Sequence, residues 1–243
     1  MKFINDKNID LVLPKQGASN RMEEWSKSEK CLRLLVTEMI DKKLITNNII
    51  DLGAYVGDNA VPWGFNYPDI QVYAIDPSEA NCKYIELFAT QNSIKNVKVI
   101  CKAVSDKNQV VSTNSGLGHC SFQVNESGKN KVNSVSLDYL YAQSIIDNVG
   151  FLHLDVEGME FNVIKGASSL INRFKPVIIF EQHTRTEPYK EICKHLKSTF
   201  GYETYMIPEV CGARQDCRNF LSIQPSLAES ITKLNHGSNL ILQ

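Results

Sequence analysis

The chain has 243 residues, of which 43% are hydrophobic and 22% charged, so it can bury the core of one ordinary globular domain. Its 26 basic and 27 acidic residues give a formal net charge of −1, which provides no basic surface for a nucleic-acid partner. The apolar runs are far shorter than the roughly 20 residues needed for a membrane span. Acid and amide residues follow Met1 too closely for a secretory signal, so we expect a cytoplasmic protein.

Seven cysteines are scattered along the chain and form no C-x-x-C pair. An odd, scattered set in a chain of this size is most simply explained as reduced thiols. Cys211 and Cys217 are close in sequence, but their spacing does not match the common zinc sites. We interpret them as ordinary half-buried cysteines.

The first 48 residues predict an N-terminal helical extension. A helix start is expected at 17–20, followed by an apolar stripe that packs on a sheet. The stripe consists of Trp25, Leu32, Leu35, Val36, Met39 and Ile40. Charged residues are expected to face elsewhere, namely Arg21, Glu23, Lys27, Lys30 and Arg33.

A short apolar strand, 49–52, carries Asp51 and runs into a glycine turn. Gly53 and Gly57 allow tight turning and close approach of the backbone to a ligand. Their G-x-x-x-G spacing is not the dinucleotide fingerprint G-x-G-x-x-G, which weakens a nicotinamide or flavin interpretation.

The next predicted strand, 72–76, ends in Asp76, and Ser78 is the expected N-cap of the following helix. A carboxylate at this place in a nucleotide-binding fold accepts hydrogen bonds from ribose hydroxyls. An acid that favours a helix N-terminus explains Asp76 equally well. A third strand is predicted over 97–104, and 112–136 are interpreted as loops around a short strand at 121–124.

The most informative stretch is 151–160, where apolar alternation runs into carboxylates and a glycine. Extended chain would place Phe151, His153, Asp155 and Glu157 on one face. A helical period follows, with Met159, Val163, Ala167 and Leu170. The stretch therefore predicts a strand, a turn and a helix, and ligands bind at the carboxyl ends of such strands.

A fifth strand, 176–183, again ends in ionisable groups, Glu181 and His183. A helix over 186–199 and two closing strands, 202–207 and 220–223, complete the chain. Alternating strands and helices predict a mostly parallel sheet with helices on both faces. We expect a single domain, with 1–48 as the extension and 49–243 as a Rossmann-like core.

Several separated motifs, in this order, resemble the FkbM family of S-adenosylmethionine (SAM)-dependent methyltransferases. The resemblance runs from about residue 49 to 184, and a weaker similarity occurs at 219–223. Its motifs are Ile50-Asp51-Leu52-Gly53-Ala54-Tyr55-Val56-Gly57, Ala74-Ile75-Asp76-Pro77, Ala103-Val104-Ser105-Asp106, Val135-Ser136-Leu137-Asp138, Leu154-Asp155-Val156-Glu157-Gly158-Met159-Glu160, Lys165-Gly166-Ala167 and Ile178-Ile179-Phe180-Glu181.

The resemblance implies a class I methyltransferase fold, with a seven-stranded sheet whose last strand is antiparallel. The chain departs from the family at three positions. The family usually has asparagine where Tyr55 stands, glutamate where Asp76 stands and lysine where His153 stands. Aspartate in place of glutamate keeps the ribose-binding chemistry.

The resemblance also implies the residues that hold SAM. Asp51 would orient the loop, Asp76 would bind the ribose hydroxyls, and Ser105 and Asp106 would lie near the adenine. The methionine and ribose portions would lie along Gly53, Ala54, Tyr55 and Gly57.

A hydroxyl acceptor needs a base or a metal, because an alcohol is a very weak acid. Asp155, Glu157 and His183 are the catalytic candidates at the strand ends, with Asp155 and His183 favoured as bases. The alternative is that Asp155 and Glu181 hold Mg²⁺ or Mn²⁺, which would act as a Lewis acid. Glu160 is expected to stabilise its helix, and His119 to be a loop residue.

Together these observations predict a SAM-dependent O-methyltransferase acting on a small-molecule or glycan acceptor, most simply a sugar hydroxyl. Two alternatives are an NAD-type oxidoreductase on a doubly wound sheet and a non-catalytic SAM-binding module. Function depends on the site residues, since a fold alone does not set it.

Overall fold

The computed structural model describes residues 7, 10–15, 29–113, 130–185, 188–211 and 215–243. Several predictions therefore lie outside the described residues. They are the helix start at 17–20, the charged positions Arg21, Glu23 and Lys27, the apolar Trp25, the strand at 121–124, and His119.

An eight-stranded sheet forms the centre of the described chain, in the order β11-β9-β10-β8-β7-β1-β2-β3. Five of its strands are parallel: β1 (Asn48–Leu52), β2 (Val72–Asp76), β3 (Val97–Cys101), β7 (Val149–Leu154) and β8 (Val177–His183). The last long strand, β10 (Cys217–Ile223), is antiparallel to both β8 and β9 (Glu203–Met206). The predicted sheet is confirmed, with the two-residue strand β11 (Ile241–Leu242) added at its edge.

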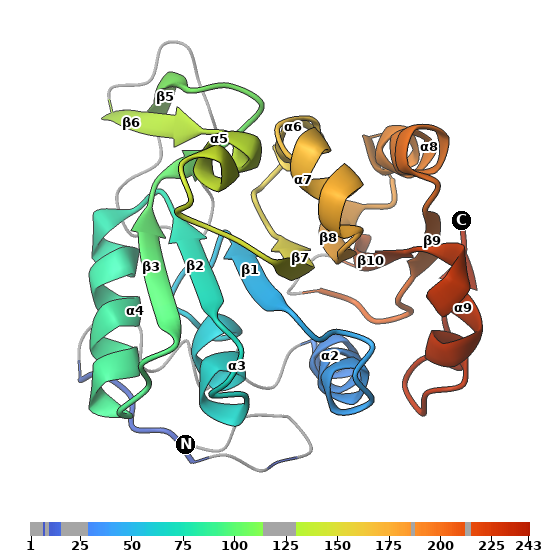
Figure 1. Cartoon of the computed structure of the whole chain (residues 1–243), viewed down its shortest axis with the longest axis horizontal. Helices are drawn as coiled ribbons and strands as arrows, with labels where there is room; N and C mark the ends of the chain where they lie inside the picture. Colours follow the sequence, from blue (N-terminus) through green and yellow to red (C-terminus); the bar gives the residue numbers. More distant parts are fainter. Residues whose placement is uncertain (1–6, 8–9, 16–28, 114–129, 186–187, 212–214) are drawn as a thin grey trace.

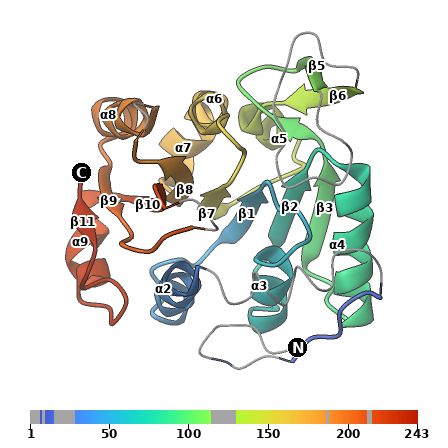
Figure 2. The ribbon, with the colours of Figure 1, turned by 180° about the vertical axis from the view of Figure 1, so that it is seen from behind.

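Helices cover both faces of this sheet, as Figures 1 and 2 show. One apolar cluster packs under α2 (Lys30–Asp41), α3 (Ala60–Asn66), α4 (Glu79–Gln91) and α9 (Pro225–Thr232). The other packs under α5 (Leu137–Ala142), α6 (Glu160–Lys165), α7 (Ser168–Phe174) and α8 (Pro188–Phe200). No helix within the described ranges is long and apolar enough to cross a membrane.

The alternation of β7 explains how one strand contributes to both clusters. Phe151 belongs to the cluster under α2 and α3, whereas Leu152 and Leu154 belong to the other. All three side chains are fully buried, and each burial contributes about 1.5–3 kcal/mol to the free energy of unfolding. The predicted alternation holds through Leu154, where the strand ends. Asp155 and Glu157 therefore lie on a loop and not on a face of the strand.

A second, three-stranded sheet replaces part of the predicted loop region. The expected strand 97–104 is broken at Lys102, and Ala103–Val104 (β4) pairs in parallel with β6 (Asn130–Val135). β6 also pairs with β5 (Gln109–Thr113), so the interpretation of 112–136 as loops around a short strand is wrong at both ends. This sheet lies beyond the carboxyl end of β3 (Figure 1). The strands are polar, and Val110 is 60% exposed, so their apolar alternation was too weak to reveal them.

Three further boundaries differ from the sequence prediction. The helix expected after 159 is split into α6 and α7 at Gly166, which packs against the backbone of Ser105. A Cβ at Gly166 would lie 2.3 Å from the Ser105 carbonyl oxygen. Strand β10 begins at Cys217 and not at 220, because hydrogen bonding to β8 extends it. Helix α9 was not predicted.

Candidate functional site

The site lies where the order of the parallel strands reverses. Strand β1 is flanked by β2 on one side and β7 on the other, although β7 comes much later in the chain. Ligands of doubly wound sheets bind at such a switch point, outside the carboxyl ends of the strands. Those ends bring together carboxylates predicted from separate motifs, namely Asp51, Asp76, Asp155 and Glu181.

The glycine turn after β1 is wedged between its two neighbouring strands. The backbone amides of Gly53 and Ala54 donate to the Ile75 carbonyl at 2.9 and 3.1 Å. Gly53 has a φ of +76°, and a Cβ there would lie 1.8 Å from the carbonyl oxygen of Asp155. Only glycine fits this position, because both the left-handed backbone and the contact exclude a side chain. The predicted cofactor loop and the predicted catalytic loop are therefore in direct contact.

Tyr55 occupies an unusual backbone conformation in this loop. Its φ is +44°, in the left-handed region where asparagine and glycine are better tolerated than other residues. Its amide donates to Asp76 Oδ2 at 2.9 Å. The backbone thus explains why asparagine, the residue the family usually has here, suits this position.

Asp76 is buried at the end of β2, with 5% of its surface exposed. It accepts hydrogen bonds from the Tyr55 amide, the Ser78 amide and the Asn81 side chain. Burial raises the pKa of Asp76 to about 6, against the lowering effect of these hydrogen bonds. The carboxylate fixes the glycine turn to β2. Its Oδ2 atom accepts the hydrogen bond from the Tyr55 amide, and a carboxylate oxygen can accept a second one from a ribose hydroxyl.

Asp51 and His153 form a buried pair between β1 and β7. They are directly opposite each other in the strand register, and Asp51 Oδ1 lies 2.7 Å from His153 Nδ1. Burial lowers the pKa of His153, but the hydrogen bond and the charge of Asp51 outweigh it, so the pKa is raised overall. The Trp63 ring packs edge-on against the imidazole at 5.8 Å. His153, at the position where the family usually has lysine, is therefore the hydrogen-bond partner of Asp51.

Ser105 and Asp106 follow β4, not β3. Ser105 is buried, its amide donates to the Val135 carbonyl at 3.0 Å, and its hydroxyl donates to Asp106 at 3.1 Å. Both residues lie at the small sheet beside Gly166. Their contact with the adenine stays a prediction.

The loop after β7 is organised by Glu160. This carboxylate is 1% exposed and accepts hydrogen bonds from the amides of Val156 and Gly158 at 3.2 and 3.1 Å. The Gln182 side chain on β8 donates to its other oxygen. The expectation of an ordinary first-turn acid was too simple, because Glu160 holds the turn that carries Glu157, whose φ is +52°.

Asp155 and Glu181 lie close to other acidic groups. The pKa of Asp155 is raised well above its ordinary range by burial and by repulsion from Glu181 and Glu29. Burial and the neighbouring Cys217 raise the pKa of Glu181 in the same direction. Such a cluster is stabilised by a cation, and the sulfonium of SAM is a cation.

His183 is held by an acid that the sequence analysis did not single out. Its Nδ1 atom lies 3.5 Å from Asp216 Oδ1, and both side chains are partly exposed. A carboxylate at Nδ1 favours the tautomer in which Nε2 is the basic nitrogen. No local pattern identifies Asp216, because the pairing of β8 with β10 brings it to His183.

The start of α2 contacts both the segment between β9 and β10 and the residues that follow the glycine turn. Glu209, from the segment between β9 and β10, accepts hydrogen bonds from the amides of Cys31 and Leu32 at the helix start. Glu29 accepts from the Asn219 side chain at 2.7 Å. Arg33 forms a part-buried ion pair with Asp58, directly after the glycine turn, with Nη2 and Oδ2 2.9 Å apart. The expectation that Arg33 faces away from the core was therefore wrong.

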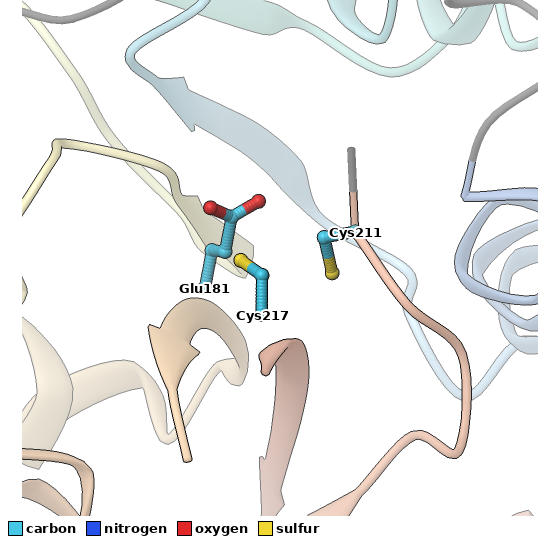
Figure 3. Close-up of side chains that lie close together, drawn as sticks. All are labelled: Glu181, Cys211 and Cys217. Carbon is cyan, nitrogen blue, oxygen red and sulfur yellow. The ribbon is translucent and has the colours of Figure 1, made fainter. Parts of the chain in front are cut away.

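Cys211 and Cys217 are buried beside Glu181, as Figure 3 shows, and not half-buried as interpreted from the sequence. The two sulfur atoms and a Glu181 carboxylate oxygen all lie within 4.8 Å of one another. Among the described residues, Asp155 is not a member of this group. The expected metal pair of Asp155 and Glu181 stays a prediction, and Glu181 also belongs to a mixed group of one carboxylate and two thiols.

The turn and the strand ends fit SAM. The glycine turn after β1 admits only a glycine at position 53, where it contacts the Asp155 carbonyl. The buried carboxylate of Asp76 lies where the resemblance places the ribose. SAM has no phosphate, which agrees with a glycine turn that lacks the pyrophosphate fingerprint.

Comparison with known proteins identifies the family. A family model described as the methyltransferase FkbM domain matches residues 51–205, more than half of the chain. No curated protein matches the chain.

Two solved structures are similar to the fold. A methyltransferase FkbM from Methylobacillus flagellatus KT has 15% sequence identity and a TM-score of 0.56, and the match covers 73% of this chain and 44% of that one. A precorrin-6y C5,15-methyltransferase from Geobacter metallireducens GS-15 has 10% identity and a TM-score of 0.50, covering 88% and 94%. At these identities the likeness concerns the fold alone. The match of the family model carries the assignment, and this chain belongs to the FkbM methyltransferase family.

Proposed function

We propose that this SAM-dependent methyltransferase transfers the methyl group to an oxygen, and that its acceptor is a sugar hydroxyl of a glycan or glycosylated metabolite. The observation that carries the proposal is the contact between the two loops of the site. The Asp155 carbonyl touches Gly53 of the glycine turn, so Asp155, our candidate base, is a direct neighbour of the loop where the resemblance puts the methionine end of SAM.

The chemistry requires a base and precise alignment. SAM supplies a methyl group that is already activated by its sulfonium. Asp155 takes the proton of the acceptor hydroxyl as the oxygen bonds to the methyl carbon, and the carbon–sulfur electron pair remains on sulfur. The products are a methyl ether and S-adenosylhomocysteine. Alignment alone contributes about 7–11 kcal/mol in well-oriented intramolecular reactions.

His183 is the second candidate for proton transfer. Its pairing with Asp216 orients the ring, as in other sites where a carboxylate fixes a histidine tautomer. Glu157 stands on the same turn as Asp155, and its negative charge raises the pKa of Asp155. We assign it to the electrostatic environment of the base.

The cofactor residues keep their predicted roles in this proposal. Asp76 binds the ribose hydroxyls, and Gly53, Ala54, Tyr55 and Gly57 line the methionine and ribose portions. Asp51, which is hydrogen-bonded to His153, orients the glycine turn from the end of β1. Ser105 and Asp106 border the adenine.

Magnesium or manganese is the less favoured way to activate the hydroxyl. Both ions prefer sets of oxygen ligands, whereas the donor atoms grouped with Glu181 are sulfur. Activity that rises when Mg²⁺ or Mn²⁺ is added to chelator-treated enzyme would restore this alternative.

An acceptor screen tests the proposal directly. Isotopically labelled SAM is incubated with the protein and a panel of free, nucleotide-linked and lipid-linked sugars, and the products are analysed by mass spectrometry. We expect label in a methyl ether that resists mild base. Label in an N-methyl or C-methyl product would contradict O-methyl transfer.

A binding comparison separates the other two candidate functions. S-adenosylhomocysteine is expected to raise the melting temperature, whereas NAD is not. A shift with NAD alone would favour the oxidoreductase. A shift with S-adenosylhomocysteine, but no turnover with any acceptor, would favour a non-catalytic SAM-binding module.

A further inference from the structure

We propose that Glu181, Cys211 and Cys217 form a zinc site with three protein ligands, whose fourth position faces the acceptor side of the active site. The three donor atoms lie within 4.8 Å of one another. Tetrahedral zinc with Zn–S bonds of about 2.3 Å places two sulfur atoms roughly 3.8 Å apart, so only a small adjustment is needed.

The strand pairing dictates this cluster. Glu181 on β8 lies opposite Asn219 on β10, and His183 lies opposite Cys217. Side chains alternate along a strand, so Glu181 and Cys217 emerge on the same face as diagonal neighbours. Cys211 is brought to them by a hydrogen bond from its own amide to the Cys217 carbonyl, at 3.2 Å. Figure 3 shows the three side chains approaching from these separate segments.

The chemistry of the donors selects the metal. Two thiolates and one carboxylate suit Zn²⁺, while Mg²⁺ and Mn²⁺ prefer oxygen. Both cysteines are almost fully buried, at 3% and 2% exposed, so the site is sheltered from bulk water. A divalent cation would also offset the negative charge that Glu181 shares with Asp155 and Glu29.

A supporting residue stands behind the ligands. Asn219 is 2% exposed, and its amide nitrogen donates to Cys211 Sγ at 3.1 Å and to Glu29 at 2.7 Å. Hydrogen bonds to ligand atoms orient metal ligands in many sites. The Asn219 carbonyl oxygen is buried and has no partner within the described part of the chain. A zinc-bound water is a donor that would satisfy it.

Three protein ligands and one open position are typical of zinc that takes part in catalysis. Leu154 and Phe180 are paired in the register of β7 and β8, so Asp155 and Glu181, the residues that follow them, lie at the same level of neighbouring segments. An acceptor hydroxyl bound at the open position would therefore lie beside the proposed base, with its pKa lowered by the metal. This role rests on the proposed O-methyl transfer, whereas zinc binding itself does not.

Metal analysis of the full chain tests the site. The protein is expressed with zinc in the medium, purified in reducing buffer without chelators, and measured by plasma mass spectrometry. We expect about one zinc per chain, and cobalt substitution should give a thiolate-to-cobalt charge-transfer band in the near ultraviolet. Cys211→Ser and Cys217→Ser should both lose the metal and the band. The control Cys193→Ser, on α8, should keep both.

A conservative variant keeps the test decisive if the serine variants fold poorly. Asn219→Ala leaves all three ligands in place and should weaken zinc affinity by about 10–100-fold. Wild-type protein that folds and binds S-adenosylhomocysteine but holds no zinc would overturn the proposal. A disulfide between Cys211 and Cys217 in protein purified without reductant would do so as well, and so would a zinc content in the two serine variants equal to that of the wild type.

The two proposals fail separately. Zinc content and the cobalt band report the metal site without turnover. Product analysis reports O-methyl transfer, and a zinc-loaded protein that makes no methyl ether would leave the metal site intact while removing the proposed function.

Discussion

Asp51 on β1 and His153 on β7 lie opposite each other in the strand register, with Oδ1 and Nδ1 2.7 Å apart and both side chains buried. The pair joins the strand that leads into the glycine turn to the strand that leads into Asp155. It therefore ties together the two loops for which we propose cofactor binding and catalysis.

Replacing His153 with leucine should destabilise the protein. Asp51 would remain buried without its partner, and breaking a buried pair in this way costs about 3–5 kcal/mol. His153→Lys, which restores the family's usual residue, should recover more than half of that loss because it supplies a cation to Asp51. Urea unfolding at neutral pH measures both variants. Equal destabilisation by leucine and lysine would mean that ring packing against Trp63, and not charge, matters here.

The backbone at Tyr55 predicts which substitutions the glycine turn tolerates. Because its φ is +44°, Tyr55→Asn should be close to neutral, while Tyr55→Val should be about 1–2 kcal/mol less stable than the asparagine variant. Valine is branched at Cβ and resists the left-handed region. Thermal unfolding and S-adenosylhomocysteine titration of both variants test this, and a valine variant as stable as the asparagine one would contradict it.

Cofactor affinity should depend on pH through Asp76. Its pKa is raised to about 6, so the carboxylate that we propose accepts hydrogen bonds from the ribose is present above this pH and lost below it. The affinity for S-adenosylhomocysteine should be constant from pH 7 to 8 and fall by up to about tenfold per pH unit below 6. Isothermal titration across this range measures the effect.

Protonation of Asp76 does not unfold the protein, so unfolding would not explain the loss of S-adenosylhomocysteine affinity below pH 6. The folded protein holds this proton more tightly than the unfolded chain, whose pKa is near 3.8, so this group favours folding as the pH falls from about 6 toward 3.8. Asp76→Asn supplies the control. It should bind S-adenosylhomocysteine more weakly, and without the step near pH 6.

Asp155→Asn should remove methyl transfer but retain cofactor binding. The amide cannot accept the acceptor's proton, and loss of a positioned general base lowers kcat by about 10²–10⁴-fold. The S-adenosylhomocysteine affinity should change by only a few-fold, because Asp155 contacts the glycine turn through its backbone. Glu191→Gln, on the exposed surface of α8, is the matched control for losing one carboxylate. Unchanged turnover in the Asp155 variant would exclude it as the base.

Arg33→Met should uncouple α2 from the glycine turn. Asp58, whose side chain is 15% exposed, would lose its guanidinium partner, which costs about 1–3 kcal/mol of the free energy of unfolding. Lys30→Met, an exposed position on the same helix, should change stability by less than about 0.5 kcal/mol. Chemical unfolding of the two variants measures the difference, and similar values would show that the ion pair contributes little.

Much of the fold could be predicted from the sequence because its signals are local. The alternation of 151–154 and the apolar run of 72–76 predicted buried strands, and Ser78 was a correct N-cap. The need for glycine at Gly53 was also visible as a turn signal, although its cause was not. That cause is the Asp155 carbonyl, which is about 100 residues away in sequence and in contact in the folded chain.

The tertiary structure alone decided which side chains meet at the strand ends. The partners of Asp51, His183 and Glu181 come from distant segments, and only the order and register of the strands determine that they are His153, Asp216 and the two thiols. The pattern of apolar residues in the sequence predicts which side chains are buried, because burial repeats every two residues in a strand and every 3.6 residues in a helix. The pattern does not predict the register of the strands, and a shift of one residue in the pairing of two strands would change every one of these partners.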